Sequence, residues 1–353
     1  MRAQAANMVG LSDILQRTWQ GRGPLAWLLL LPGCIFLLVA VLRRALYRLG
    51  ILHSERLPVP VVMVGNIIVG GSGKTPLTLW LAQQMLERNW HPGIVSRGYA
   101  GSLPAGVVRE VLADSNTLEM GDEPLLLKRR SGLPVFVGSD RVAAARSLLA
   151  IYPDCDLIIS DDGMQHYRLQ RDVEIALLDG RGLMNGWPLP AGPLREPASR
   201  LARVDAIVSN GESNLPICPA PVFSMKLTGD MFYLLSDPKQ TCTTATLKPL
   251  RLAAIAGMGM PQRFFQHLRA LGLRFSEHAF PDHHRYDAAD LAAIQADALL
   301  VTEKDAVKCA GLTERPVWVL PVTAQVAPAA AGIDLAAHVE YCIREKMHGR
   351  PPA

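Results

Sequence analysis

Short apolar runs recur through the first two thirds of the chain, separated by stretches with the spacing of amphipathic helices. The runs cover residues 59–64, 93–95, 135–137, 157–159, 173–178 and 206–208. Their hydrophobicity is mostly continuous rather than alternating, which is typical of strands covered on both faces of a parallel sheet. Because helical stretches lie between them, the pattern predicts a doubly wound, mostly parallel α/β sheet.

A second run of α/β signals begins at residues 252–257, which predict a strand entering a helix near Pro261. Residues 298–302 and 317–321 predict two further strands. The turn-rich stretch before this unit includes the alternating residues 222–227, which predict an exposed strand in a connector. We therefore expect an N-terminal helical segment, a main domain, linker strands, a smaller α/β domain and a loose tail, at residues 1–55, 56–215, 216–251, 252–346 and 347–353.

An uncharged stretch from Pro24 to Leu42 dominates the N-terminal segment. As a helix it would reach about 28 Å, close to the ~30 Å hydrocarbon core of a bilayer. Pro32-Gly33 lies near its middle and predicts a kinked helix or a shallow insertion. Both flanks are basic, with more arginines after the stretch, which favours a cytoplasmic main domain and also fits an interfacial anchor. We expect a membrane-associated helix, with a buried core helix as the alternative.

The amino-acid composition argues against several classes of function. The 353 residues are 49% hydrophobic, which is ample for the core of one large or two ordinary domains. The six cysteines form no C-x-x-C pair, so neither a zinc site nor a disulfide framework is indicated, and a reducing compartment is expected. The formal charge of +4 comes without a long Lys/Arg run, so nucleic acid is not an expected partner. No obligate protein partner is evident either.

The run at 59–64 leads into a glycine-rich segment and then a helical pattern at residues 76–87. Glycines let successive backbone N–H groups turn toward one anion, while Lys74 can bridge the β- and γ-phosphates and the Thr75 hydroxyl can ligate Mg²⁺. The usual motif has an earlier glycine where this chain has Ile68. The segment predicts a phosphate loop for a nucleoside triphosphate, formed by Ile68, Val69, Gly70, Gly71, Ser72, Gly73, Lys74 and Thr75.

Polar residues follow several predicted strands, at the edge where such sheets bind ligands. Asp161-Asp162 ends the run at 157–159, where phosphate-loop enzymes place a Mg²⁺ ligand, although an Asp-Gly turn is the plain alternative. Gln165 and His166 follow closely enough to contact substrate, although a histidine next to Tyr167 is as often a packing residue. The stiff segment before Arg195 could aim its guanidinium at an anion, and a solvated turn would explain it equally well.

Two further clusters could supply a base. Asp122-Glu123 precedes a predicted helix, where helix capping is the alternative. Residues 282–286 combine an acid, two histidines and an arginine, a poor zinc pattern but a better loop-borne acid–base or phosphate cluster, with a solvated loop as the alternative. Residues 302–305 have the charge density of a functional loop, although surface salt bridging explains them as well.

These residues together resemble the tetraacyldisaccharide 4′-kinase family over nearly the whole length. The resemblance rests on the basic, apolar N-terminus and on the blocks at residues 65–76, 96–99, 121–124, 161–167, 189–196, 282–283 and 302–308. The family's phosphate loop also lacks the early glycine. The resemblance implies a P-loop NTPase-like kinase core, at residues 56–215, joined through a strand linker to a smaller α/β domain.

The resemblance also implies transfer of the ATP γ-phosphoryl group to the 4′-hydroxyl of a lipid-linked tetraacyldisaccharide 1-phosphate, with Mg²⁺, at the cytoplasmic face of the inner membrane. Asp122 with His283 looks like the catalytic dyad, with Asp162 as the alternative base, and Thr75, Asp161 and Asp162 look like the metal site. Supporting phosphate, metal or substrate contacts are implied for Tyr99, Glu123, Arg141, Gln165, His166, Arg195 and Glu196.

A membrane-associated ATPase switch is the alternative from another class, since such proteins share the Gly-Gly-x-Gly-Lys-Thr loop. They carry a second lysine just ahead of the glycines, and this chain has Val69 there. The lysine that such a switch contributes across its dimer is therefore missing.

Overall fold

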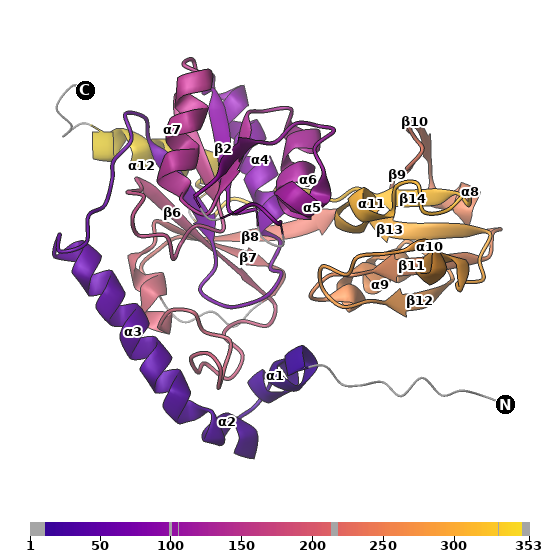
Figure 1. Ribbon diagram of the computed structural model, residues 1–353, viewed down its shortest axis with the longest axis horizontal. Coiled ribbons are helices and arrows are strands. Elements are labelled where there is room, and N and C mark those ends of the chain that lie inside the picture. Colours follow the sequence, from indigo (N-terminus) through magenta and orange to yellow (C-terminus); the bar gives the residue numbers. More distant parts are fainter. Residues whose placement is uncertain (1–10, 99–100, 105, 213–217, 331, 348–353) are drawn as a thin grey trace.

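The computed structural model describes residues 11–98, 101–104, 106–212, 218–330 and 332–347. Figure 1 shows a larger and a smaller α/β unit side by side, with N-terminal helices along the larger one. The larger unit contains a nine-stranded sheet in the order β15-β8-β7-β6-β1-β5-β2-β4-β3. Its strands are β1 (Val61–Gly65), β2 (Pro92–Ser96), β3 (Val108–Glu110), β4 (Val135–Gly138), β5 (Leu157–Asp161), β6 (Val173–Asp179), β7 (Ala206–Asn210), β8 (Val222–Thr228) and β15 (Thr323–Val326).

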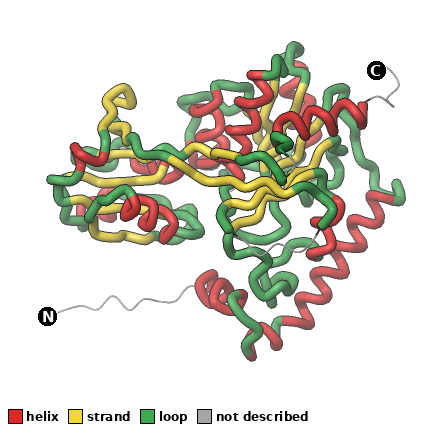
Figure 2. The backbone as a smooth tube through the Cα atoms, turned by 180° about the vertical axis from the view of Figure 1, so that it is seen from behind, coloured by secondary structure: helices red, strands yellow, loops and turns green. Residues whose placement is uncertain are grey.

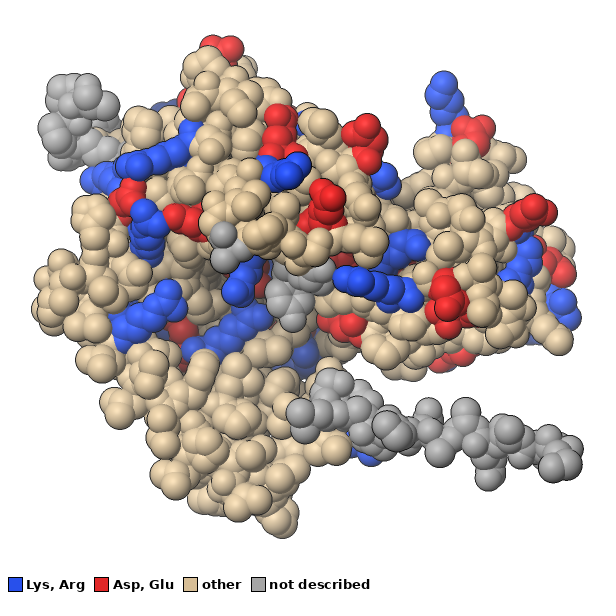
Figure 3. All heavy atoms as spheres, viewed as in Figure 1, with Lys and Arg blue, Asp and Glu red and all other residues tan. Residues whose placement is uncertain are grey.

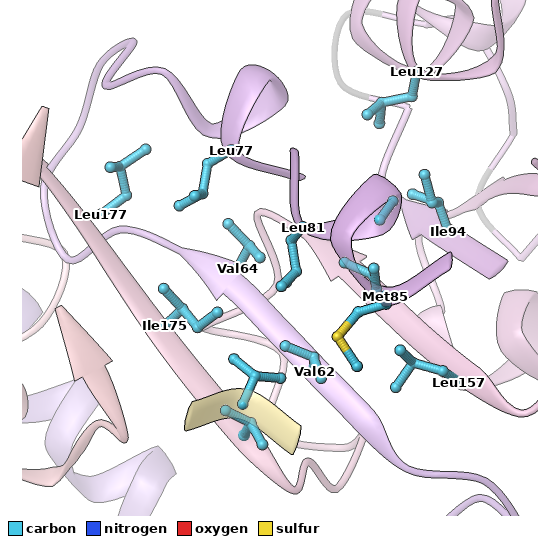
Figure 4. Close-up of a cluster of buried hydrophobic side chains, with 14 of the residues drawn as sticks. Val62, Val64, Leu77, Leu81, Met85, Ile94, Leu127, Leu157, Ile175 and Leu177 are labelled. Carbon is cyan, nitrogen blue, oxygen red and sulfur yellow. The ribbon is translucent and has the colours of Figure 1, made fainter. Parts of the chain in front are cut away.

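All strand pairs from β8 to β4 are parallel, and only the edge strands β15 and β3 run antiparallel. Helices cover both faces of this sheet: α4 (Lys74–Glu87), α5 (Thr117–Met120), α6 (Asp122–Ser131), α7 (Arg141–Ile151), the 3₁₀ helix η1 (Ala198–Arg203) and α12 (Leu335–Met347). Val62 and Val64 of β1 pack with α4 on one face, while Met63 packs with α7 residues on the other. Figure 4 shows the first of these clusters. This two-sided burial explains the continuous apolar runs.

The smaller unit contains a six-stranded sheet in the order β10-β9-β14-β13-β11-β12. Strands β12, β11, β13 and β14 are parallel, and β9 and β10 are antiparallel additions. Its elements are β9 (Phe232–Leu234), β10 (Asp237–Cys242), α8 (Thr244–Leu247), β11 (Leu252–Ala256), α9 (Pro261–Ala270), β12 (Phe275–Ala279), α10 (Ala288–Ala292), β13 (Ala298–Thr302), α11 (Glu303–Cys309) and β14 (Val317–Leu320).

The chain crosses between the two sheets twice, which differs from the expected division. Residues 232–242, expected in a linker, pair within the smaller sheet. Residues 323–347, expected mostly in the smaller domain, return to the larger sheet, where β15 pairs with β8 and α12 packs into the core. Figure 2 shows the two crossings side by side. Local periodicity predicts a strand but not the sheet that receives it, so the sequence pattern missed this return. The expected tail after Met347 lies outside the described residues.

The N-terminal helices are α1 (Leu11–Trp19), α2 (Pro24–Leu28) and α3 (Leu30–Arg48). The break in the apolar stretch falls at Leu29 rather than at Pro32-Gly33. Pro32 lies in the first turn of α3, where a missing N–H costs no hydrogen bond. Helix α3 is long and apolar enough to cross a membrane, and only 6% of its apolar window is buried. Its exposure excludes the alternative of a buried core helix.

Candidate active site

The phosphate loop connects β1 to α4 at the carboxyl edge of the larger sheet. Gly73, at the start of α4, has a φ of +97°, and a Cβ there would lie 2.8 Å from Nδ2 of Asn210. Only glycine fits this position without strain. The Ser72 hydroxyl is buried and has no hydrogen-bond partner among the described atoms. An unpaired buried donor at a helix N-terminus suits an anionic ligand.

Ile68 occupies the position of the usual early glycine, and hydrogen bonds of the backbone hold this part of the loop. Its side chain is fully buried, and its N–H donates to Oδ1 of Asn66 at 3.0 Å. The flanking backbone pairs with a second segment: the N–H of Val69 donates to the Pro193 carbonyl at 2.9 Å, and the N–H of Arg195 donates to the Ile67 carbonyl at 2.8 Å. The first half of the loop is therefore extended, and a residue with positive φ is not needed there.

Asp161 ends β5 next to β1, and its carboxyl group is fully buried. One oxygen accepts a hydrogen bond from the Thr78 hydroxyl at 3.1 Å, while the other has no hydrogen-bond partner among the described atoms. Burial raises the pKa of Asp161 to about 7, the charge of Glu123 adds to the shift, and Lys74 opposes it. A carboxylate poised near neutrality in a phosphate site is a candidate functional group.

Asp162 behaves in the opposite way. Burial alone would raise its pKa, but the positive charges of Lys74, Arg195 and Arg141 outweigh burial and lower it. Lys74 Nζ lies 3.7 Å from Oδ1, and Arg195 Nη1 lies 3.3 Å from it. Arg141 Nη2 donates to the Asp162 carbonyl at 3.2 Å. The ionised carboxylate therefore lies directly beside the phosphate-loop lysine.

A second layer of polar groups supports the loop. Gln165 donates both to the Asn66 carbonyl at 3.1 Å and to Glu196 at 2.8 Å. Glu196 is almost fully buried and also accepts from the Tyr167 hydroxyl at 2.6 Å. His166 is largely buried, and burial together with the charge of Arg141 lowers its pKa to about 4, so its imidazole is neutral near pH 7. Tyr99 lies outside the described residues.

The smaller unit brings His283 onto the larger one. Asp122 begins α6, and His283 follows β12 with a φ of +59°. Nδ1 of His283 lies 3.2 Å from Oδ2 of Asp122, across 161 residues of sequence. Burial works against the charge of Asp122, but the hydrogen bond from His283 and the nearby charges of Lys304, His283 and Lys308 outweigh it and lower the pKa. Positive φ at a non-glycine residue is a form of strain that functional sites tolerate.

Comparisons with known proteins bear on this arrangement. A profile of the family described as tetraacyldisaccharide-1-P 4′-kinase matches residues 25–340. The chain belongs to this family. A tetraacyldisaccharide 4′-kinase of Dechloromonas aromatica is 51% identical over 97% of this chain and 100% of its own length, and one of an Azoarcus species is 50% identical over 95% and 96%. The crystal structure of LpxK from Aquifex aeolicus in complex with ATP has a TM-score of 0.76 at 29% identity and covers 91% of this chain and 99% of its own.

Membership in the tetraacyldisaccharide 4′-kinase family confirms the predicted family, fold class and kinase activity. The ATPase-switch alternative lacks this support.

Several groups in this kinase fold escaped the sequence reasoning. Asn66 is fully buried at the loop, and its Nδ2 has no hydrogen-bond partner among the described atoms. Asp179 at the end of β6 holds Arg181 by 2.8 to 3.1 Å contacts, and Nη1 of Arg181 lies 2.9 Å from the place of a Cβ on Gly70. Polar residues after a buried strand were a usable signal for Asp179 and Arg181.

His284 turns away from the dyad and bonds Asp290 at 2.8 Å. It therefore has a structural partner of its own and does not join His283 at the Asp122 carboxylate. The described residues contain no group of three or more His, Cys, Asp or Glu side chains arranged as metal ligands. Mg²⁺ at a nucleotide needs only one or two carboxylates beside phosphates and waters, so the unpaired Asp161 oxygen, Asp162 and Thr75 fit such an ion.

Proposed function

We propose that the chain transfers the γ-phosphoryl group of ATP to the 4′-hydroxyl of a tetraacyldisaccharide 1-phosphate, giving lipid IV-A. The observation that carries the proposal is a catalytic pair assembled from both units beside a phosphate loop. Lys74 and the glycines of the larger unit offer a phosphate cradle, and His283 of the smaller unit contacts Asp122 of the larger one at 3.2 Å. A donor and an acceptor-activating group must meet in this way for phosphoryl transfer.

The dyad supplies the base in this proposal. Asp122 would take the proton of the acceptor hydroxyl late in the transfer, while Nδ1–H of His283 donates to the Asp122 carboxylate and orients it. The lowered pKa of Asp122 keeps its carboxylate ionised and able to accept that proton, as the catalytic Asp of other kinases does. Asp162 is instead held by the two cations Lys74 and Arg195, which lower its pKa beside the phosphate loop.

The phosphate side of the site follows from the charges around it. Lys74, with backbone N–H groups of residues 68–75, would hold the phosphates, and Arg141 and Arg195 orient Asp162 beside them. Thr75, Asp161 and Asp162 would hold Mg²⁺, with Glu123 nearby. When bound, the ion neutralises charge on the transferred group. Gln165 and Glu196 hold the loop, and the neutral His166 lies next to them.

The enzyme works at the cytoplasmic face of the inner membrane in this proposal. Along α2 and α3 the apolar side chains of Leu28, Leu31 and Leu38 are 68% to 74% exposed. In Figure 3, Lys and Arg side chains gather between the N-terminal helices and the body of the larger unit. The guanidinium groups of Arg43 and Arg171 lie over the ring of Tyr167, at 5.9 and 5.0 Å from its centroid. Apolar exposure beside cations suits a membrane surface and an anionic lipid substrate. No obligate protein partner and no nucleic acid are expected.

The test is incubation with labelled ATP and a tetraacyldisaccharide 1-phosphate, followed by location of the new phosphate on the sugar. We expect Asp122→Ala and His283→Ala each to lower kcat by about 10²- to 10⁴-fold, because general base catalysis is lost, with ATP affinity changed only a few-fold. Loss of ATP binding in either variant would reassign that residue to the phosphate site. ATP hydrolysis by the wild type that ignores the acceptor would instead support the switch.

A further inference from the structure

Lys304 lies where the two units meet at the dyad. It belongs to the first turn of α11, and its side chain is only 19% exposed. Its ammonium nitrogen is 3.2 Å from Oε1 of Glu123, 3.5 Å from Oδ1 of Asp282, 3.5 Å from Nε2 of His283 and 4.0 Å from Oδ2 of Asp122. One cation therefore lies within 4.0 Å of three carboxylates and of the dyad imidazole.

These groups come from three separate segments. Asp122 and Glu123 begin α6 of the larger unit, Asp282 and His283 follow β12 of the smaller unit, and Lys304 follows β13. Helices α6 and α11 pack against each other. The contact is reinforced at the far end of α6, where Arg130 pairs with Glu303 at 2.5 Å. The ammonium group thus links the start of α6 to the loop after β12 and to α11, three segments that are far apart in the sequence.

The local charges require a cation at this place. Three carboxylates converge here, and that of Asp122 is 95% buried, so its charge is costly without a partner. Burial alone would lower the pKa of Lys304, but the charges of Glu123, Asp122 and Asp282 outweigh burial and raise it. The ammonium group is therefore charged, and surface salt bridging does not describe it.

Lys308, one turn further along α11, is placed differently. Its nitrogen lies 2.9 Å from Asp305 of its own helix and 3.9 Å from Asp122. It adds positive charge near the dyad but does not bridge Glu123, Asp282 and His283. Of these two lysines, only Lys304 also contacts Glu123, Asp282 and His283 within the described part of the chain.

We propose that Lys304 is a positioning residue of the phosphoryl transfer, which holds Asp122 and His283 in register across the two units. The inference rests on the proposed function. Lys304 acts through the dyad: it fixes the Asp122 and Glu123 carboxylates against His283, so that the Asp122 carboxylate is aimed at the acceptor hydroxyl. Removing it leaves three repelling carboxylates and a loosened dyad, which lowers turnover and leaves the phosphate cradle intact.

The test compares Lys304→Met, Lys304→Gln and Lys304→Arg with Lys239→Met, a matched change at an exposed lysine of β10. We expect both neutral variants to lower kcat about 30-fold or more, with KM for ATP within about threefold. Lys304→Arg should retain kcat within about fivefold, since it keeps the charge, and Lys239→Met should match the wild type. Thermal melting and ATP titration establish that each variant is folded.

A double-mutant cycle separates positioning from general support of the fold. If Lys304 acts through Asp122, then Lys304→Met combined with Asp122→Asn should be no slower than Asp122→Asn alone. Multiplied losses in the double variant, or a folded neutral variant with kcat within threefold of wild type, would overturn the inference. A wild type that does not phosphorylate the acceptor would overturn the proposed function itself, and the role of Lys304 with it.

Discussion

Asp161 and Asp162 are neighbours in the chain, yet their surroundings give them opposite proton affinities. The carboxyl group of Asp161 is buried. One of its oxygens accepts from the Thr78 hydroxyl and the other has no hydrogen-bond partner among the described atoms, so burial raises its pKa to about 7. Asp162 turns toward Lys74 and Arg195, which lower its pKa. The two carboxyl groups are therefore suited to different tasks. Ionisation of the buried Asp161 lowers the free energy of unfolding of the protein.

This cost predicts how stability depends on pH. The folded-state pKa of Asp161 lies above its unfolded value, so the favourable contribution of the protonated group is present at low pH and is lost as pH rises through about 7. Asp161→Asn can keep the bond from Thr78 and has no charge to bury. We expect its advantage in unfolding free energy over the wild type to grow by about 2 kcal/mol between pH 5 and pH 8. Urea denaturation without nucleotide or metal measures it, and a pH-independent difference would contradict it.

At the scale of single elements, the phosphate loop and helix α3 differ in how their apolar side chains are covered. The loop's Ile68 is buried by pairing with residues 193–195, which lie far along the chain. Helix α3 does the reverse, because most of its apolar side chains have no protein to cover them. Apolar surface on this scale calls for a membrane or another covering surface.

We expect the double change Leu31→Asp and Leu38→Asp to abolish membrane binding without harming the fold. Both side chains are about 70% exposed, so the unfolding free energy should change by less than about 0.5 kcal/mol each. Each carboxylate would cost roughly 2.5–3.5 kcal/mol near the bilayer centre, so vesicle affinity should fall at least tenfold. Cosedimentation with vesicles containing phosphatidylglycerol measures this. The control is Leu112→Asp, at an exposed leucine of the larger unit. Equal vesicle binding by the wild type, the double variant and Leu112→Asp would refute membrane insertion of α3.

At the scale of the whole molecule, the chain leaves the larger unit after β8 and returns to it through β15. Thr228 and Thr323 are register partners in that antiparallel pair, so the two crossings lie side by side. Helix α12 then completes the core of the larger unit through Leu335, Val339 and Ile343, all fully buried. The phosphate-loop unit is thus assembled from both ends of the described chain, with the smaller unit as an insertion before its last strand and helix.

Val339→Ala tests this assembly. We expect a loss of about 1–3 kcal/mol from the cavity, with faster amide exchange in β1 and β6 and not in β11 and β13. Hydrogen exchange with mass spectrometry measures both regions. Val319→Ala, at an equally buried position of β14, should show the reverse pattern. Loss of protection in the smaller sheet after Val339→Ala would mean that α12 belongs energetically to the smaller unit.

The sequence by itself determined the features that depend on neighbours in the chain. The phosphate loop from Gly70 to Thr75, the buried strands and the exposed apolar segment follow from local composition and period, and the family resemblance followed from the order of such blocks. The tertiary structure decided what depends on distant partners. It placed β15 and α12 on the larger sheet, made Asp161 and Asp162 electrostatically unlike, and brought Lys304 to Asp122, Glu123 and His283. Strand pairing and burial of charge are set by residues far apart in sequence, so the local pattern does not contain them.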